Sequence, residues 1–158
     1  MHMSRLGLAT WVTGLGVVLA AGSAWADSSA FVGRWHLNQA QSVLPPGEPV
    51  PKDVIAEISR ADSTHVKWSL TVVAAQGQTS VETFDAVANG EFYPINSDTT
   101  AAFRLNGNLL QSTFKGPSGQ TDTLTCTLSA DQRKMTCRGA LSDGDGRTTN
   151  YVDIYDRM

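Results

Sequence analysis

Residues 65–72 read HVKWSLTV and decide the fold class, because polar and apolar side chains alternate in them without a break. A period of two is typical of a β-strand that buries one face. Val66, Trp68, Leu70 and Val72 would form the buried face. Similar alternation recurs on both sides of this segment, so we expect a protein built of strands.

The segments between the predicted strands are short and carry turn residues. Asn-Gly pairs at 89–90 and 106–107 are strong signals of tight hairpins, and residues 76–77 and 143–146 are further turns. About eight to ten strands joined in this way describe a meander. A meander of this length closes most simply into a single up-and-down antiparallel β-barrel, which removes the exposed sheet edges. A β-sandwich is the alternative.

The first 26 residues have the plan of a secretory signal peptide. Arg5 precedes an apolar run over residues 6–21, and the small residues Ala24 and Ala26 flank Trp25 at a cleavage site. The run is shorter than a membrane-spanning helix requires. We therefore expect residues 1–26 to be removed and residues 27–158 to form one barrel domain, periplasmic or secreted and without a membrane span.

Composition excludes several classes of partner. The chain has 158 residues and is 41% hydrophobic, which is enough for the core of one domain. Its 12 Lys and Arg residues are outnumbered by 15 Asp and Glu residues, so no basic face for nucleic acid is expected. The sequence indicates no metal site and no cofactor.

The two cysteines fall in one predicted hairpin. Residues 124–128 and 135–137 each alternate, and a turn-rich segment separates them. If Leu128 faces Met135, then Cys126 faces Cys137. Directly opposed residues of an antiparallel pair are close enough for a disulfide, and export favours its formation. We predict this bridge.

One connection is longer than the others. Residues 38–53 include the Pro-rich stretch 45–51. Proline lacks the N–H group that a strand ladder requires, and long loops in compact domains are often functional. The segment is either a stiff connector across one end of the barrel or a lid over its mouth.

Gly33-Arg34-Trp35 resembles the G-x-W motif of lipocalins and related calycins. Other stretches resemble an exported, lipocalin-like bacterial domain family of unknown function; they are Gly33–Asn38, Ser42 with Pro45–Lys52, Asn89–Pro94, Ser129–Asp131 and Asn150–Arg157. The resemblance covers nearly all of the mature chain and implies a β-barrel. It also implies structural roles for Gly33 and Trp35, with Arg157 packed over the Trp35 ring as an arginine near the last strand is in lipocalins, although Arg34, or a Trp35 that is purely structural, would serve equally well.

Two registers are open for residues 79–88. If Thr79 pairs with Ala74, Asp85 faces Trp68 inside the barrel, whereas a one-residue slip places Glu82, Phe84 and Ala86 inside. The resemblance favours the slip. Whichever register holds, four acids are candidates to lie near the interior, namely Glu57, Glu82, Asp85 and Asp153. The residues that we expect to contact a ligand are Trp68, Phe84, Tyr93, Phe103, Arg104 and Tyr151.

These observations favour an exported barrel that binds a small apolar or amphipathic ligand, with Arg104 as an anchor for an anionic head group. A protein-binding module is the second hypothesis, such as an inhibitor of an exported protease with residues 27–30 as its arm. The third is a cofactor-free isomerase, cyclase or lyase that uses a buried carboxylate. We favour a binding protein over an enzyme and assign no catalytic residue.

Expression of the full chain in a bacterium should yield periplasmic protein that begins at Asp27, because signal peptidase requires small residues around the cut. Intact-mass measurement of the periplasmic fraction tests this. Ala26→Arg should block the cleavage. Periplasmic protein that retains Met1 contradicts the prediction.

Overall fold

A computed structural model of the chain describes residues 29–158, and the predicted signal peptide lies outside these residues. The described part contains ten strands and no helix that could cross a membrane. The strands are β1 (Gly33–Leu37), β2 (Asp53–Ala61), β3 (His65–Val73), β4 (Thr79–Val87), β5 (Tyr93–Pro94), β6 (Thr100–Asn106), β7 (Leu109–Lys115), β8 (Thr121–Leu128), β9 (Lys134–Ser142) and β10 (Thr148–Arg157).

The ten strands form one antiparallel sheet in the order β4-β3-β2-β1-β10-β9-β8-β7-β6-β5. Strands that follow one another in sequence are neighbours, and the pairing of β1 with β10 joins the two halves of the sheet. β4 is not paired with β5 or β6, so the sheet is closed except at this gap. The chain is thus an all-β, nearly closed up-and-down barrel, as the sequence predicts, and not a β-sandwich.

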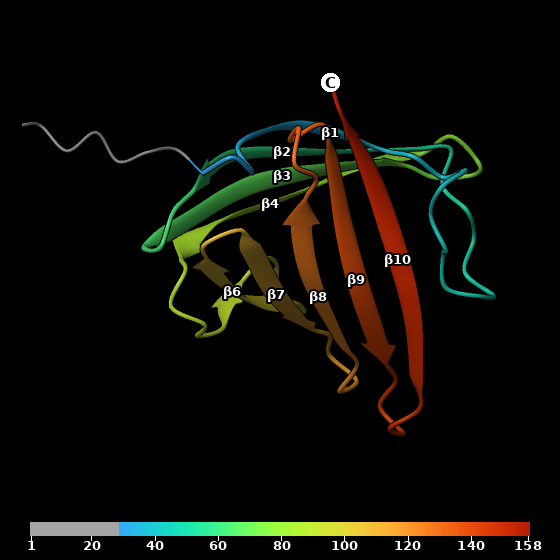
Figure 1. Cartoon of the computed structure of the whole chain (residues 1–158). Helices are drawn as coiled ribbons and strands as arrows, with labels where there is room; N and C mark the ends of the chain where they lie inside the picture. The colour runs from blue at the N-terminus through green and yellow to red at the C-terminus, as the bar shows by residue number, and fades with distance from the viewer. Residues whose placement is uncertain (1–28) are drawn as a thin grey trace, which may run out of the picture.

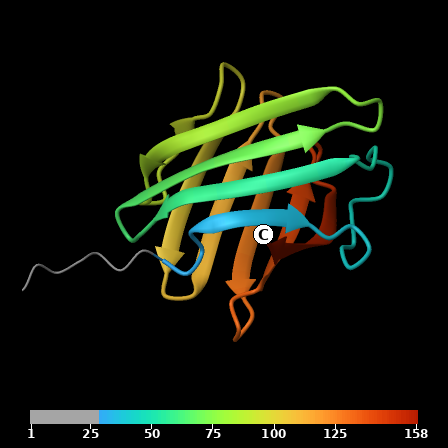
Figure 2. The same ribbon diagram turned by 90° about the horizontal axis from the view of Figure 1, so that it is seen from above.

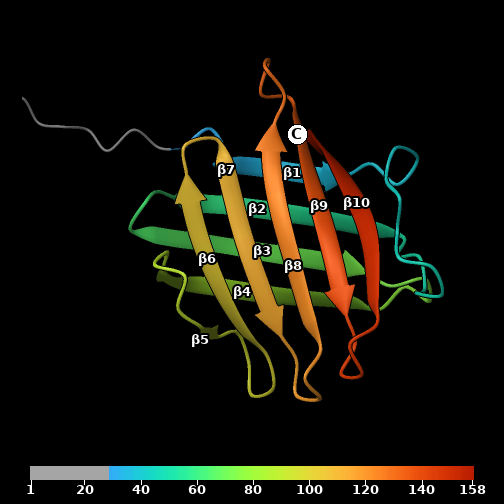
Figure 3. The ribbon, with the colours of Figure 1, turned by 60° about the horizontal axis from the view of Figure 1, so that its bottom comes forward.

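The curved sheet folds into two layers. Strands β1–β4 form the first layer (Figure 1) and cross over the strands of the second layer (Figure 2), which is formed by β6–β10 (Figure 3). Trp68 on β3 pairs with Phe84 on β4, which is the register that the resemblance favours. Phe84 therefore packs between the layers, and Asp85 lies on the outer face with His65 and Lys67.

We call the pairing of β1 with β10 the seam. It contains three residue pairs, beginning with Trp35 opposite Arg157. Trp35 is fully buried, and its indole N–H donates a hydrogen bond to the carbonyl oxygen of Phe31 at 2.9 Å. The guanidinium carbon of Arg157 lies 4.0 Å from the centre of the Trp35 ring. Arg34 instead pairs with Glu57 on the exposed face.

Arg157 also connects the seam to the segment before β1 and to the turn before β9. Its guanidinium donates hydrogen bonds to the carbonyl oxygens of Ala30, Val32 and Gln132. Gly33 leaves space for this group, because a Cβ atom there would lie 2.5 Å from Nη1 of Arg157. The φ angle of Gly33, +147°, is also one that other residues rarely adopt.

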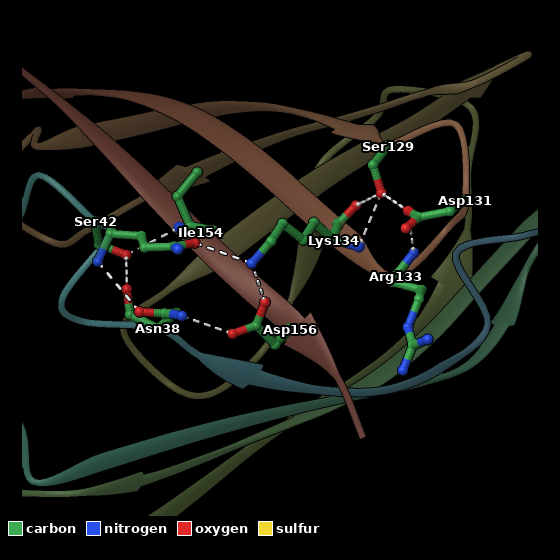
Figure 4. A network of polar contacts seen from close by, with 9 residues as sticks. Asn38, Ser42, Ser129, Asp131, Arg133, Lys134, Ile154 and Asp156 are labelled. Atoms are coloured by element: carbon green, nitrogen blue, oxygen red, sulfur yellow. Dashed lines mark hydrogen bonds and ion pairs between the residues drawn. The ribbon is translucent and has the colours of Figure 1, made fainter.

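A polar network continues the seam on its outer side (Figure 4). The carboxylate of Asp156 accepts hydrogen bonds from Lys134 and, at 2.7 Å, from Asn38. These bonds, chiefly that from Lys134, lower the pKa of Asp156. The Ser42 hydroxyl accepts a hydrogen bond from the Ile154 amide at 2.9 Å. The start of the long connection is therefore held along β10.

The predicted disulfide between Cys126 and Cys137 is confirmed. The two residues pair directly across β8 and β9, as the hairpin register requires. Both are buried on the inner face of the sheet. The bridge therefore fixes these two strands at the middle of the second layer.

Replacing Trp35 by alanine should lower the free energy of unfolding by about 3–5 kcal/mol, as for other buried aromatic residues, because the ring is fully buried and supports Arg157. Chemical denaturation measures this loss. Arg34→Ala, at the neighbouring exposed position, is the control and should cost less than about 1 kcal/mol. An equally small loss for Trp35→Ala would contradict the role of the seam.

Candidate ligand-binding cavity

A cavity of about 380 Å³ lies between the two layers. This volume falls within the range of about 300–1,000 Å³ that is typical of small-molecule sites. The apolar part of its wall comes from both layers and consists of Ala56, Ile58, Trp68, Leu70, Phe103, Leu110, Phe114, Leu124, Met135 and the disulfide. The polar part consists of Glu82, Thr99, Ser112, Asp122, Tyr151, Asp153 and Tyr155.

An aromatic cluster forms one side of the cavity. The Trp68 ring has its centre 6.2 Å from the centres of the rings of Phe84, Phe103 and Phe114. These side chains come from both layers and fill the interior next to the gap between β4 and β6. The indole N–H of Trp68 is buried and has no hydrogen-bond acceptor among the described residues. A buried donor without an acceptor is costly.

On the second layer, Tyr151 reaches across a neighbouring strand to Asp122. The Tyr151 hydroxyl donates to the Asp122 carboxylate, with oxygen–oxygen distances of 2.7 and 2.8 Å. Tyr151 is on β10 and Asp122 on β8, and the ring passes over Gly139 on the β9 strand between them. A Cβ atom on Gly139 would lie 2.1 Å from the ring, so this hydrogen bond requires glycine at that position.

Asp153 lies on the same face of β10, two residues after Tyr151. Burial, and next the charge of Asp122, raises the pKa of Asp153 from the usual 3.8 to about 6. Burial also raises the pKa of Asp122, against the opposite effect of the Tyr151 hydrogen bond. We call Asp122 and Asp153 the carboxylate pair. It places negative charge in a mainly apolar cavity.

The residues that the sequence predicts to contact a ligand separate into two groups. Trp68, Phe103 and Tyr151 line the cavity. Phe84 is buried and stacks on Trp68 but is not part of the lining.

Tyr93 and Arg104 lie outside the cavity. The Tyr93 hydroxyl accepts a hydrogen bond from Asn89 at 3.0 Å. Arg104 is exposed and covers Gly90, where a Cβ atom would lie 2.0 Å from its Nε. Arg104 follows Phe103 in the same strand, and adjacent residues of a strand point to opposite faces. The expected anionic-ligand anchor is therefore absent from this cavity.

Sequence reasoning missed Asp122 entirely and named Asp153 only as one of four acids. A signal for Asp122 exists, because it shares the parity of Leu124 and Cys126 in the predicted cysteine hairpin. That parity places its side chain on the inner face. The bond to Tyr151 has no such signal, because it spans two strands and depends on Gly139.

The long connection does not contribute to the cavity wall. Its first part pairs with β10, through a bridge between Val43 and Val152. Residues 45–51 are mostly exposed and are not among the lining residues. In this arrangement the segment is a connector at the side of the barrel (Figure 3).

No family model and no curated protein sequence matches the chain. Solved structures do match. The fluorescent protein UnaG, wild type, has a TM-score of 0.52 and 19% identity, covering 81% of this chain and 97% of UnaG. Zebrafish ileal bile acid-binding protein complexed with cholic acid has a TM-score of 0.52 and 15% identity, covering 82% and 100%. A mutant of the fatty acid transporter REP1-NXSQ has a TM-score of 0.50 and 16% identity, covering 80% and 97%. At these identities the similarity shows a shared fold, the up-and-down β-barrel, and no more.

Asp153→Asn should make the protein more stable at pH 7, by on the order of 1 kcal/mol. With a pKa raised to about 6, the folded state binds the Asp153 proton more tightly than the unfolded chain does. Stability therefore falls as pH rises from about 4 to about 6, and the variant lacks this loss. Urea denaturation at pH 4, 5, 6 and 7 measures it.

The control is Asp98→Asn, which removes an exposed carboxyl group from a turn. It should leave the difference between pH 4 and pH 7 as in the unmodified protein. If Asp153→Asn changes stability by the same amount at every pH, the carboxyl group is not held in the environment described.

Proposed function

We propose that the protein is an exported carrier that binds one small, mainly apolar molecule in the cavity between its layers. The cavity itself is the observation that carries this proposal. Sites for small molecules are typically clefts of about 300–1,000 Å³ with mainly apolar walls and a few polar groups. A space of about 380 Å³ lined by large apolar side chains from both layers fits this description.

The structural neighbours support a ligand of this kind. One of them is complexed with cholic acid and another is named as a fatty acid transporter. Both ligands combine a large apolar body with a polar end. The cavity described here has a matching division, with an aromatic side and a polar cluster on the second layer.

Export is supported by the sequence of residues 1–26 and by the disulfide, since disulfides persist mainly outside the cytosol. An exported carrier would bind its ligand outside the cytosol. The protease-inhibitor and enzyme hypotheses remain predictions from the sequence, and no contact described above favours either of them.

Titration of the purified protein with the uncharged dye Nile red tests the proposal. We expect saturable binding of one dye molecule per chain, with a rise in dye fluorescence and a change in Trp68 emission, because that indole lines the cavity. Ala56→Phe places a ring inside the cavity and should weaken binding at least tenfold. Ala75→Phe, in an exposed turn, should not.

Circular dichroism and thermal unfolding establish that both variants are folded. Absence of saturable binding to the unmodified protein would overturn the proposal. So would equal binding by the two variants, because the dye would then be bound at the outer surface.

A further inference from the structure

The charges that line the cavity all have the same sign. Glu82, Asp122 and Asp153 contribute three carboxyl groups to its wall. No lysine, arginine or histidine is among the lining residues that the structure describes. Arg104, the basic residue that the sequence predicts to anchor a ligand, is exposed on the outer face. An anionic ligand would therefore meet like charge without a counter-charge.

The carboxylate pair has no cationic partner in the part of the chain that the structure describes. Among residues 29–158, neither Asp122 nor Asp153 takes part in an ion pair. Both carboxyl groups are partly buried, and acidic groups that are withdrawn from water are normally paired. Asp122 has one neutral donor, the Tyr151 hydroxyl, which leaves its charge uncompensated. The pair therefore offers a place for a positive charge from outside the chain.

The opposite wall of the cavity is aromatic. Trp68 on β3 is part of that wall, whereas the carboxylate pair is on β8 and β10. An occupant that spans the two layers would contact both walls. Its apolar body would lie against the aromatic cluster, and its charged end would lie against the carboxylates.

From these observations we infer that the ligand is an apolar amine, protonated at neutral pH, whose ammonium group lies at the acidic part of the cavity wall, to which Asp122 and Asp153 belong. This inference rests on the proposed function and names the chemical class of its ligand. Ammonium–carboxylate hydrogen bonds are stronger than bonds between neutral groups. A charged pair in a mainly apolar cavity is also less screened than one at the surface. Discrimination against carboxylic acids follows from repulsion by the same two groups.

Three probes with one chain length test the inference, namely decylamine, decanol and decanoate. Each is titrated against the protein loaded with Nile red at pH 7.5, and displacement of the dye gives its affinity. We expect decylamine to bind at least tenfold more tightly than decanoate, with decanol between them. Decanoate binding as tightly as decylamine would overturn the inference but leave the carrier proposal intact. Displacement of the dye by none of the three would also overturn it.

Variants separate the charge from the shape of the cavity. Asp122→Asn and Asp153→Asn should each weaken decylamine binding at least fivefold and change decanol binding less than twofold. Asparagine at position 122 keeps an acceptor for the Tyr151 hydroxyl, so the arrangement of side chains is preserved. Asp98→Asn, an exposed position, should change neither affinity. Equal losses for decylamine and decanol would show that the two residues only shape the cavity, and would overturn the inference.

A protein that does not bind Nile red has no accessible cavity, and the displacement series then has nothing to displace. In that case the proposed function fails first and the inference fails with it. The dye alone therefore distinguishes the two failures.

Discussion

The fold depends on the seam, where Arg157 lies over the buried ring of Trp35 and its guanidinium binds three backbone carbonyl groups. All the other strand pairings are between neighbours in sequence, and apart from that of β1 with β2 they close short loops, which costs little entropy. The seam instead joins the first strand to the last. Without it the chain would form two separate sheets, β1–β4 and β5–β10.

The two sides of the barrel are held by different forces. The seam is held by backbone hydrogen bonds, a cation over an aromatic ring and the network around Asp156. The opposite side has no ladder between β4 and β6 and is held by packing of Phe84 against Phe103, with ring centres 4.7 Å apart. Packing is less directional than hydrogen bonding, so the gap is the place where the two layers are least constrained relative to each other.

Alternation of side chains predicts most of this architecture, because a period of two specifies both the strand and its buried face. It does not specify pairing. The register of β4 is open from the sequence alone, since Asp85 and Phe84 are adjacent and either parity provides plausible inner residues. The disulfide is predictable because a short hairpin leaves one register for two cysteines. Arg104 does not face the cavity, and the reason is visible in the sequence. Phe103 and Arg104 are neighbours in one strand, so they cannot both face inward.

The hydrogen bond between Tyr151 and Asp122 is less predictable, because it joins β10 to β8 across β9 and needs a glycine at position 139 on the strand between them. Nothing in the sequence around Gly139 indicates that it has a role, yet a single methyl group there would displace the Tyr151 ring. Substitutions at positions 139 and 151 are therefore expected to depend on each other. Homologous chains that carry a side chain at the position of Gly139 should lack a large aromatic residue at that of Tyr151, and with it the bridge to Asp122. This covariation would divide relatives of the barrel into those that keep the acidic cavity and those that have exchanged it for another specificity.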